Sequence, residues 1–388
     1  MKIAFESQLL INGNKTGIPC CAHNLIKGIA QEDGYSCQLN YFSKGISKEK
    51  LDNLNEYEEL GIQRNASSCL KNSWYKYLWL LFPMIPYSCF FGKSAQVTQF
   101  FNYAVPPGVK GKTVTMVHDM AHLACRETVR IKTRIWLDLV LKASCKRADV
   151  ILAVSEFSKS EILKYLNVPE EKIRVLHPGV DLELFHSGYS DQDVRDACCK
   201  YGIHERYILY TGTIEPRKNI QRLIEAYDNL ASDSDIEELP QLVLAGGKGW
   251  LCDDIYKAAE NSKVKDLINF TGFVDTEDLP LLMKGAEFFC FPSLYEGFGI
   301  PPVEAMACGT PILAAKAASL PEVLGDQAVY VDPLSVDSIA LGMKKLILNP
   351  ELRKKMASDG LEYVKRYDWK YSVEILSGIY KELCQQLE

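Results

Sequence analysis

Short apolar runs alternate along the chain with longer segments in which apolar residues recur every three or four positions. A short run is typical of a buried strand, and the longer period is typical of a helix with one buried face. Strands are predicted at residues 2–5, 38–42, 97–101, 113–117, 150–154, 207–210, 241–245, 268–270, 289–291 and 311–315. Because strands alternate with helices, the pattern predicts α/β architecture with parallel sheets.

Helices are predicted at residues 21–29, 133–146, 220–230, 303–308, 333–348 and 363–387. Ser158 and Glu161 have the spacing of a capping box, which predicts another helix beginning there. The segment 187–206 is polar and rich in turn residues, and a second α/β series begins after it. We therefore predict two α/β domains, residues 1–195 and 196–362, followed by a terminal helix in residues 363–388.

The charge balance argues against nucleic acid as a partner. Net charge is −6 over 388 residues and the pI is near 5.7, whereas a nucleic-acid-binding domain is normally basic. The thirteen cysteines are scattered without a C-x-x-C pair, and we interpret them as reduced thiols of a cytoplasmic protein. The apolar run after Met1 meets Glu6 at once and is too short for a signal peptide.

The segment 74–91 is the most hydrophobic stretch of the chain and is rich in aromatic residues. It is long enough to raise the question of a membrane span, but one lysine and two prolines interrupt it. We predict a partly buried helix followed by a proline-broken connector. The alternative is a patch at a membrane interface, formed by Trp74, Trp79 and Phe82, because aromatic side chains favour the headgroup region.

One stretch, residues 289–311, combines a buried strand, a loop with two glycines and the start of a helix. Gly297 and Gly299 allow backbone N–H groups to approach a ligand, and a helix N-terminus attracts anions. Glu296 lies in the loop and Glu304 lies one turn into the helix. Carboxylates repel phosphate but accept hydrogen bonds from hydroxyl groups, so we expect both to face a sugar. The alternative is an ordinary loop with two surface glutamates.

Arg217 and Lys218 lie where a loop enters a helix, and Pro216 suits the first helical position. Cations are unfavourable at the N-terminus of a helix, so two of them there need a reason. Together with unpaired N–H groups they could hold a diphosphate without a metal. The alternative is a pair of exposed basic residues.

Metal and cofactor motifs are weak. His118, Asp119 and His122 follow a strand but form no clear set of metal ligands. Two Asp-x-Asp triplets, 191–193 and 233–235, lie in polar segments with no strand directly before them, and we interpret both as solvated loops. No G-x-G-x-x-G follows the first strand and no Walker A sequence occurs, which excludes dinucleotide and P-loop sites. We therefore expect neither a metal nor a cofactor.

The spacing of Glu296 and Glu304, with the Gly-Phe-Gly-x-Pro sequence between them, resembles the retaining GT-B glycosyltransferases of family 4. The resemblance covers nearly the whole chain and is strongest over residues 207–311. It implies two Rossmann-like domains that face each other across a cleft, with the last helix crossing back to the first domain. It also implies a nucleotide-diphospho-sugar donor and no divalent metal.

The resemblance assigns roles to particular residues. Glu304 would bind the ribose hydroxyls, Glu296 and the glycine loop would hold the sugar, and Lys218 with Arg217 would neutralise the diphosphate. The family commonly has an arginine at the position of Thr213, and Arg217 could supply the missing guanidinium. The remaining expected donor contacts are the sugar-facing His118 and the loop residues Gly17, Gly246, Phe273, Val274, Gly297, Phe298 and Gly299.

The resemblance also suggests a biological role. The Glu-Pro-Arg-Lys-Asn loop is similar to that of bacterial mannosyl- and rhamnosyltransferases of surface-polysaccharide assembly, which favours mannosyl transfer from GDP-mannose over a UDP-linked donor. The acceptor would be a saccharide or a polyprenyl-linked saccharide at the inner face of the membrane. Two alternatives remain: a sugar-nucleotide epimerase or phosphorylase with the same fold, and a non-catalytic scaffold for polysaccharide assembly.

Overall fold

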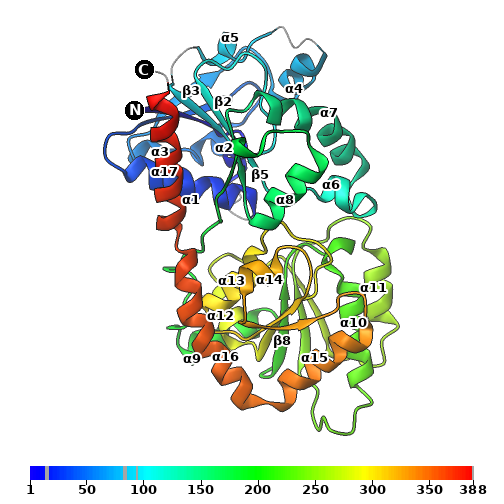
Figure 1. Cartoon of the computed structure of the whole chain (residues 1–388). Helices are drawn as coiled ribbons and strands as arrows, with labels where there is room; N and C mark the ends of the chain where they lie inside the picture. The colour runs from blue at the N-terminus through cyan, green and yellow to red at the C-terminus, as the bar shows by residue number, and fades with distance from the viewer. Residues whose placement is uncertain (14–16, 82–84, 93–94, 387–388) are drawn as a thin grey trace. The chain divides into compact units, whose positions relative to one another are not determined.

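The computed structural model describes residues 1–13, 17–81, 85–92 and 95–386. The chain divides into two compact units, each with its own parallel sheet (Figure 1). We call residues 1–123, 131–179 and 369–388 the N-terminal unit, and residues 124–130 and 180–368 the C-terminal unit. The chain passes from the first unit to the second after Gly179, which is earlier than the domain boundary predicted at residue 195. The short segment 124–130 also belongs to the second unit.

The N-terminal unit is built on seven parallel strands in the order β3-β2-β1-β4-β5-β6-β7. Their bounds are β1 (Lys2–Glu6), β2 (Ser36–Phe42), β3 (Gln63–Ser67), β4 (Val97–Phe100), β5 (Lys112–Val117), β6 (Val150–Ala153) and β7 (Ile173–Val175). The edge strand β3 was not predicted, because its sequence Gln-Arg-Asn-Ala-Ser is polar and pairs with β2 on one side only. The central strands are predicted correctly because nearly all their residues are buried and apolar residues dominate them, although β4 and β5 also bury the polar Thr98, Gln99 and Thr115.

Nine helices of this unit lie within the described residues. They are α1 (Ile18–Gln31), α2 (Lys48–Asp52), α3 (Asn55–Glu59), α4 (Asn72–Leu81), α5 (Ser88–Phe91), α6 (Ala121–Ala124), α7 (Ile131–Arg147), α8 (Glu156–Tyr165) and α17 (Trp369–Gln385). The predicted capping box of α8 is wrong by one turn: Ser155 is the cap and accepts a hydrogen bond from the Ser158 N–H at 2.9 Å. Ser158 and Glu161 are buried inside the helix instead.

The aromatic segment is mostly core. Trp79 is 4% exposed and belongs to a cluster that includes Tyr75, Tyr87 and Phe91, so its placement in an interfacial patch is wrong. Trp74, by contrast, is 70% exposed, and Phe82 lies outside the described residues. Within the described part of the chain, no helix is both long enough and apolar enough to cross a bilayer.

The C-terminal unit has six parallel strands in the order β10-β9-β8-β11-β12-β13. They are β8 (Tyr207–Thr211), β9 (Gln241–Ala245), β10 (Ile268–Gly272), β11 (Phe288–Phe291), β12 (Ile312–Ala315) and β13 (Ala328–Val331). The strands β8, β9 and β11 are adjacent, so the loops that follow them emerge at the same edge of the sheet. In open α/β sheets this carboxyl edge is the ligand-facing one.

The helices of the C-terminal unit are α9 (Asp191–Lys200), α10 (Ile220–Leu230), α11 (Asp253–Glu260), α12 (Leu279–Gly285), α13 (Ile300–Ala307), α14 (Leu320–Leu324), α15 (Val336–Leu348) and α16 (Pro350–Tyr363). The apolar stripe predicted for α10 is buried as expected. The prediction of a single helix over residues 363–387 is wrong. Helix α16 ends at Tyr363, a 3₁₀ turn spans Val364–Tyr367, and α17 begins at Trp369. Val364 and Tyr367 are buried, and the Tyr367 hydroxyl donates to Val323 O at 2.8 Å, which holds this turn in place.

Candidate active site

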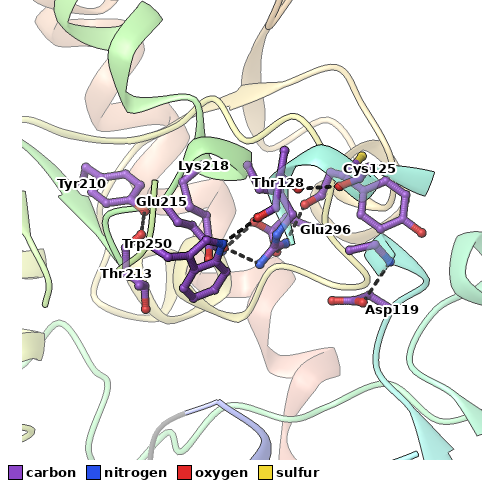
Figure 2. A network of polar contacts seen from close by, with 12 residues as sticks. Asp119, Cys125, Thr128, Tyr210, Thr213, Glu215, Lys218, Trp250 and Glu296 are labelled. Carbon is purple, nitrogen blue, oxygen red and sulfur yellow. Dashed lines mark hydrogen bonds and ion pairs between the residues drawn. The ribbon is translucent and has the colours of Figure 1, made fainter. Parts of the chain in front are cut away.

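Three of the predicted catalytic residues meet at the carboxyl edge of the second sheet (Figure 2). Arg217 and Lys218 lie in a 3₁₀ turn, Pro216–Lys218, in the loop after β8. Glu296 lies in the loop after β11. Its Oε1 is 2.7 Å from Lys218 Nζ, and its Oε2 is 3.0 Å from the Arg217 guanidinium. The structure therefore joins the two cations directly to the first glutamate of the motif.

A second carboxylate, Glu215, completes this group and was not predicted. Glu215 Oε1 accepts a hydrogen bond from Arg217 Nη2 at 2.8 Å, and the residue is 1% exposed. Arg217 Nη1 also donates to the Tyr295 carbonyl at 2.7 Å. We call Glu215, Arg217, Lys218 and Glu296 the charged cluster. The sequence did contain a signal for Glu215, because it lies within three residues of two cations in a loop that follows a buried strand.

The charged cluster is largely buried and formally neutral, with two carboxylates and two cations. Burial alone would raise the pKa of Glu296, but the charges of Arg217 and Lys218 outweigh burial and lower this pKa to about 2. Burial also raises the pKa of Glu215, and Arg217 opposes that change. Glu296 is therefore ionised throughout the physiological pH range.

Polar contacts fix the two loops that carry the charged cluster. Ser319 Oγ is 3.0 Å from both the Glu296 and the Phe298 carbonyl, and it is fully buried. Asn219 adopts a left-handed backbone conformation with φ 60°, and its Nδ2 donates to the carbonyls of Pro292 and Pro333. Asn219 thus joins the start of α10 to the end of β11. Neither Ser319 nor Asn219 was predicted, because their roles depend on loops distant in sequence.

Glu304 differs sharply from Glu296. It lies on α13, is partly exposed, and its carboxylate has no hydrogen-bond partner among the residues that the structure describes. Burial raises its pKa to about 7. Gly299 precedes α13 with φ 96°, a conformation that favours glycine. Within the described part of the chain, the Glu304 carboxylate is therefore an unused acceptor.

The other loops of this edge carry the predicted nucleotide contacts. A Cβ at Gly246 would lie 1.9 Å from the Gly212 carbonyl oxygen, so close packing of the loops after β8 and β9 explains this glycine. Phe273 follows β10 and is 66% exposed, whereas Val274 is buried. Phe298 is also buried. These residues share an edge with the charged cluster, and only Phe273 offers a large exposed surface.

Two predicted residues, His118 and Gly17, belong to the N-terminal unit. His118 follows β5, and its Nε2 is 2.7 Å from the Phe101 carbonyl, so Nε2 carries the proton. Burial lowers the pKa of His118, which keeps the imidazole neutral and makes Nδ1 an acceptor. Gly17 precedes α1 with φ 60°, and a Cβ there would meet no atom within 4 Å.

Side chains considered for metal binding have other partners. Asp119 Oδ1 accepts from the Ala121 N–H at 3.0 Å. Asp233 and Asp235 lie 2.7 and 2.6 Å from Lys344 Nζ. The triplet 191–193 is the first turn of α9, so its prediction as a loop is wrong. Over residues 1–13, 17–81, 85–92 and 95–386, no group of three metal-ligating side chains is found.

One further contact in Figure 2 joins the segment 124–130 to the rest of the C-terminal unit. The Trp250 indole N–H donates to the Thr128 carbonyl at 2.7 Å, and the Arg130 guanidinium lies 4.7 Å from the centre of the Trp250 ring. No feature of the sequence indicated this contact.

Comparison with solved structures shows the fold. The chain aligns with HepE of Anabaena, in a structure with UDP and glucose, at a TM-score of 0.75, with 18% identity over 98% of this chain and 100% of that one. A sucrose-phosphate synthase of Thermosynechococcus elongatus gives a TM-score of 0.73 at 18% identity, covering 99% of each chain. Both units thus match the two Rossmann-like domains of the GT-B fold.

Comparison by sequence shows the family. The model "Glycosyl transferases group 1" matches residues 201–362, and "Glycosyltransferase Family 4" matches residues 100–184. O-antigen chain mannosyltransferase B of Escherichia coli is 33% identical over 73% of each chain. The serotype-specific mannosyltransferase WbdA of Escherichia coli is 29% identical over 71% of this chain, which spans about a third (34%) of that protein. Together with the motif Glu296…Glu304 at the sheet edge, these matches show that the chain is a GT-B glycosyltransferase of family 4.

Proposed function

We propose that this enzyme transfers a mannosyl group, with retention of configuration, from GDP-mannose to a saccharide or polyprenyl-linked saccharide during surface-polysaccharide synthesis. One observation carries the proposal. Two buried cations, Arg217 and Lys218, lie at the same sheet edge as Glu304, whose carboxylate has no partner among the described residues. The names of the mannosyltransferases that the chain resembles favour mannose.

Each residue has a distinct task in this proposal. Glu304 accepts hydrogen bonds from the ribose hydroxyls. Lys218 and Arg217 neutralise the departing diphosphate, which is the main electrostatic demand of the reaction. Glu296 and the loop of Gly297, Phe298 and Gly299 hold the sugar. Further contacts come from Gly246, Phe273 and Val274 in the nucleotide pocket, from Gly17 at the diphosphate and from His118 at the donor sugar.

Retention of configuration at the anomeric carbon requires one of two routes. Either the carbon is inverted twice, through a covalent intermediate, or the acceptor attacks from the same face that the leaving group departs from. No side chain of the charged cluster is suited to be a covalent nucleophile, because Glu296 is already paired with both cations. We therefore favour front-face attack, in which the acceptor oxygen bonds to the anomeric carbon as the bond to the diphosphate breaks. The leaving phosphate oxygen accepts the acceptor's proton. No divalent metal is needed, because fixed cations supply the neutralising charge.

The decisive experiment compares GDP- and UDP-linked sugars as donors, with mannosyl-saccharide acceptors, and follows the products by mass spectrometry and NMR. We expect α-linked product from GDP-mannose, with the rate unchanged by EDTA. Turnover of nucleotide-sugar without an acceptor would instead indicate an epimerase. Activity abolished by EDTA and restored by manganese would contradict the metal-free mechanism.

We further propose that the N-terminal unit contacts the surface of an anionic membrane, where a lipid-linked acceptor would be found. Trp74 and Tyr77 on α4 are 70% and 65% exposed. Beside them, α7 presents an exposed stripe of Ile131, Ile135 and Leu139, with lysines on the same helix. The two helices are in contact, since the Trp79 and Trp136 rings lie 5.9 Å apart. Exposed apolar side chains flanked by lysines are typical of interfacial helices.

The test is co-sedimentation with vesicles of phosphatidylglycerol and phosphatidylethanolamine. Replacing Trp74, Ile135 and Leu139 together by serine should release the protein while leaving its melting temperature within a few degrees. A matched control replaces the exposed Leu251 and Leu334 of the C-terminal unit. Vesicle binding that survives the first set of substitutions would refute this surface.

A further inference from the structure

Glu296 occupies the two cations that the proposed function assigns to the donor diphosphate. Its Oε1 binds Lys218 at 2.7 Å and its Oε2 binds Arg217 at 3.0 Å. With Glu215 included, the charged cluster has no net formal charge. A diphosphate beside this arrangement would meet no uncompensated positive charge, and it would be repelled by the Glu296 carboxylate. Diphosphate binding therefore requires that Glu296 release one of the two cations.

The two cations are held very differently. Arg217 has further acceptors in Glu215 Oε1 at 2.8 Å and the Tyr295 carbonyl at 2.7 Å. The Lys218 ammonium, which carries three N–H donors, has a single hydrogen-bond acceptor among the described residues, Glu296 Oε1. Its flexible stem also allows the ammonium to turn without moving the backbone. Lys218 is therefore the cation that can change partners, whereas Arg217 is fixed.

We propose that Lys218 exchanges partners when the donor binds: its ammonium moves from Glu296 Oε1 to a phosphate oxygen, and Glu296 Oε1 then accepts a hydrogen bond from a sugar hydroxyl. The inference rests on the proposed function and deepens it. Arg217 keeps its bond to Glu296 Oε2 throughout, so the carboxylate stays in place. Its fixed charge acts on the diphosphate from that position, and only Lys218 moves to contact a phosphate oxygen directly. One movement thus creates the binding position for the leaving group and the binding position for the sugar.

The exchange has a consequence that a purely structural ion pair would not have. If Glu296 competes with phosphate for Lys218, neutralising its carboxylate should strengthen the binding of a bare phosphate anion. If the pair only holds the loop in shape, the same change should weaken anion binding. Inorganic pyrophosphate is the suitable probe, because it reports on the cations without contributions from ribose, base or sugar.

The experiment measures pyrophosphate affinity by calorimetry for the wild-type protein, Glu296→Gln and the control Glu287→Gln. Glu287 is also a largely buried carboxylate of the C-terminal unit, paired with Arg206 at 2.6 Å and Arg353 at 3.5 Å. We expect Glu296→Gln to bind pyrophosphate at least about tenfold more tightly, because one close opposing charge in a partly buried site acts more strongly than it would in bulk water. Sugar transfer should fall at least about tenfold. Glu287→Gln should leave the affinity unchanged.

Weaker pyrophosphate binding by Glu296→Gln would overturn the exchange. If that variant does not fold, a crystal structure of the wild-type protein with pyrophosphate decides: Lys218 Nζ must contact a phosphate oxygen and leave Glu296 Oε1, and a retained ion pair would refute the proposal. The outcome is separate from that of the proposed function. A wild-type protein that transfers sugar can fail this test, and a protein that turns over no nucleotide-sugar can still pass it.

Discussion

Two glutamates of one motif have opposite electrostatic surroundings. The pKa of Glu296 is lowered to about 2, because the cations Arg217 and Lys218 outweigh the effect of burial. The pKa of Glu304 is raised to about 7, because burial acts on it without an opposing charge. The first is a permanently charged member of a buried network, and the second is an acceptor without a partner among the described residues, which supports the proposed ribose contact. The same residue type thus serves two roles through its neighbours alone.

Glu304 should make the folded protein less stable as pH rises. Its pKa is 4.5 when unperturbed and about 7 when folded, so between these values the native state binds more protons than the unfolded state. Stability therefore falls as pH rises through this window, and the loss is complete above pH 7. Glu304→Gln removes this loss, so at pH 8 the variant should be more stable than the wild type by roughly 1–3 kcal/mol, and at pH 4 the two should be equal. Urea denaturation at both pH values measures this difference.

The same variant should bind GDP more weakly, because an amide is a poorer acceptor than a carboxylate. Wild-type affinity for GDP should rise as pH increases through 7, and the variant should lose that dependence. A Glu304→Gln variant that is less stable than the wild type at pH 8 would show that the carboxylate has a partner in the folded protein. A variant that keeps the wild-type affinity for GDP would show that Glu304 does not bind the nucleotide.

Lys218→Ala should lower turnover by about 10²-fold or more, comparable with removing one preorganised donor from a developing anion. Lys344→Ala is the matched control, because Lys344 is also an ion-paired lysine of the C-terminal unit, with Asp233 and Asp235 as its partners. Steady-state rates with GDP-mannose should be near wild type for the control. Equal losses in the two variants would indicate a general effect of ion-pair removal.

At the scale of single elements, short polar contacts decide where helices begin. Ser155, fully buried, caps α8 one turn before the position that the sequence pattern indicated. In α10 the left-handed Asn219 takes the cap position, but its side chain makes no capping hydrogen bond to the helix backbone. Its Nδ2 donates to two distant carbonyls, and its Oδ1 accepts from the Arg222 guanidinium at 3.0 Å. Such caps matter most beside the site, because α10 and α13 both start at the edge that carries the charged cluster.

Ser155→Ala should destabilise the protein by about 1 kcal/mol, the usual cost of losing an N-cap oxygen, because the variant loses the hydrogen bond from the Ser158 N–H to the Ser155 hydroxyl. The exposed Ser160 lies within the same helix, and Ser160→Ala should change stability by only a few tenths of a kcal/mol. Denaturant midpoints of the two variants provide the comparison. A larger loss for Ser160→Ala would show that the cap is wrongly placed.

At the scale of the whole molecule, the two ends of the chain belong to the same unit. The last helix, α17, packs against α1, where Gly28 makes the close approach possible. A Cβ at Gly28 would lie 2.3 Å from Val373 Cγ2. Tyr35 adds a hydrogen bond of 2.7 Å to the Ser377 hydroxyl. The C-terminal segment therefore contributes to the core of the N-terminal unit.

Gly28→Ala should destabilise the protein by about 1–3 kcal/mol, because the added methyl group overpacks the contact with the stiff side chain of Val373. Gly378 of α17 has no atom near the place of its missing Cβ, so Gly378→Ala should be neutral or stabilising by up to about 1 kcal/mol. Adding Val373→Ala to Gly28→Ala should recover part of the loss, which a double-mutant cycle measures. Independent effects of the two changes would contradict this packing.

Elements with a local pattern of apolar residues could be predicted from the amino-acid sequence. The central strands of both sheets and the amphipathic helix α10 have apolar residues at the right period, and the glycine loop with Glu296 and Glu304 is one continuous motif. The family followed from that motif. The polar edge strand β3 and the 3₁₀ turn before α17 could not be predicted in this way, because tertiary contacts rather than local pattern hold them.

Which charged side chains contact one another depends on how the chain folds. The cation pair Arg217 and Lys218 was predicted apart from Glu296, and their contact forms only because β8 and β11 pair and bring their loops to one edge. The roles of Ser319 and Asn219 depend on the same meeting of loops, whereas Glu215 reaches Arg217 within one loop. Burial likewise separated Trp79 in the core from Trp74 at the surface, although both lie in one aromatic run. Charge pairing and burial depend on distances between residues far apart in the chain, which a linear pattern does not contain.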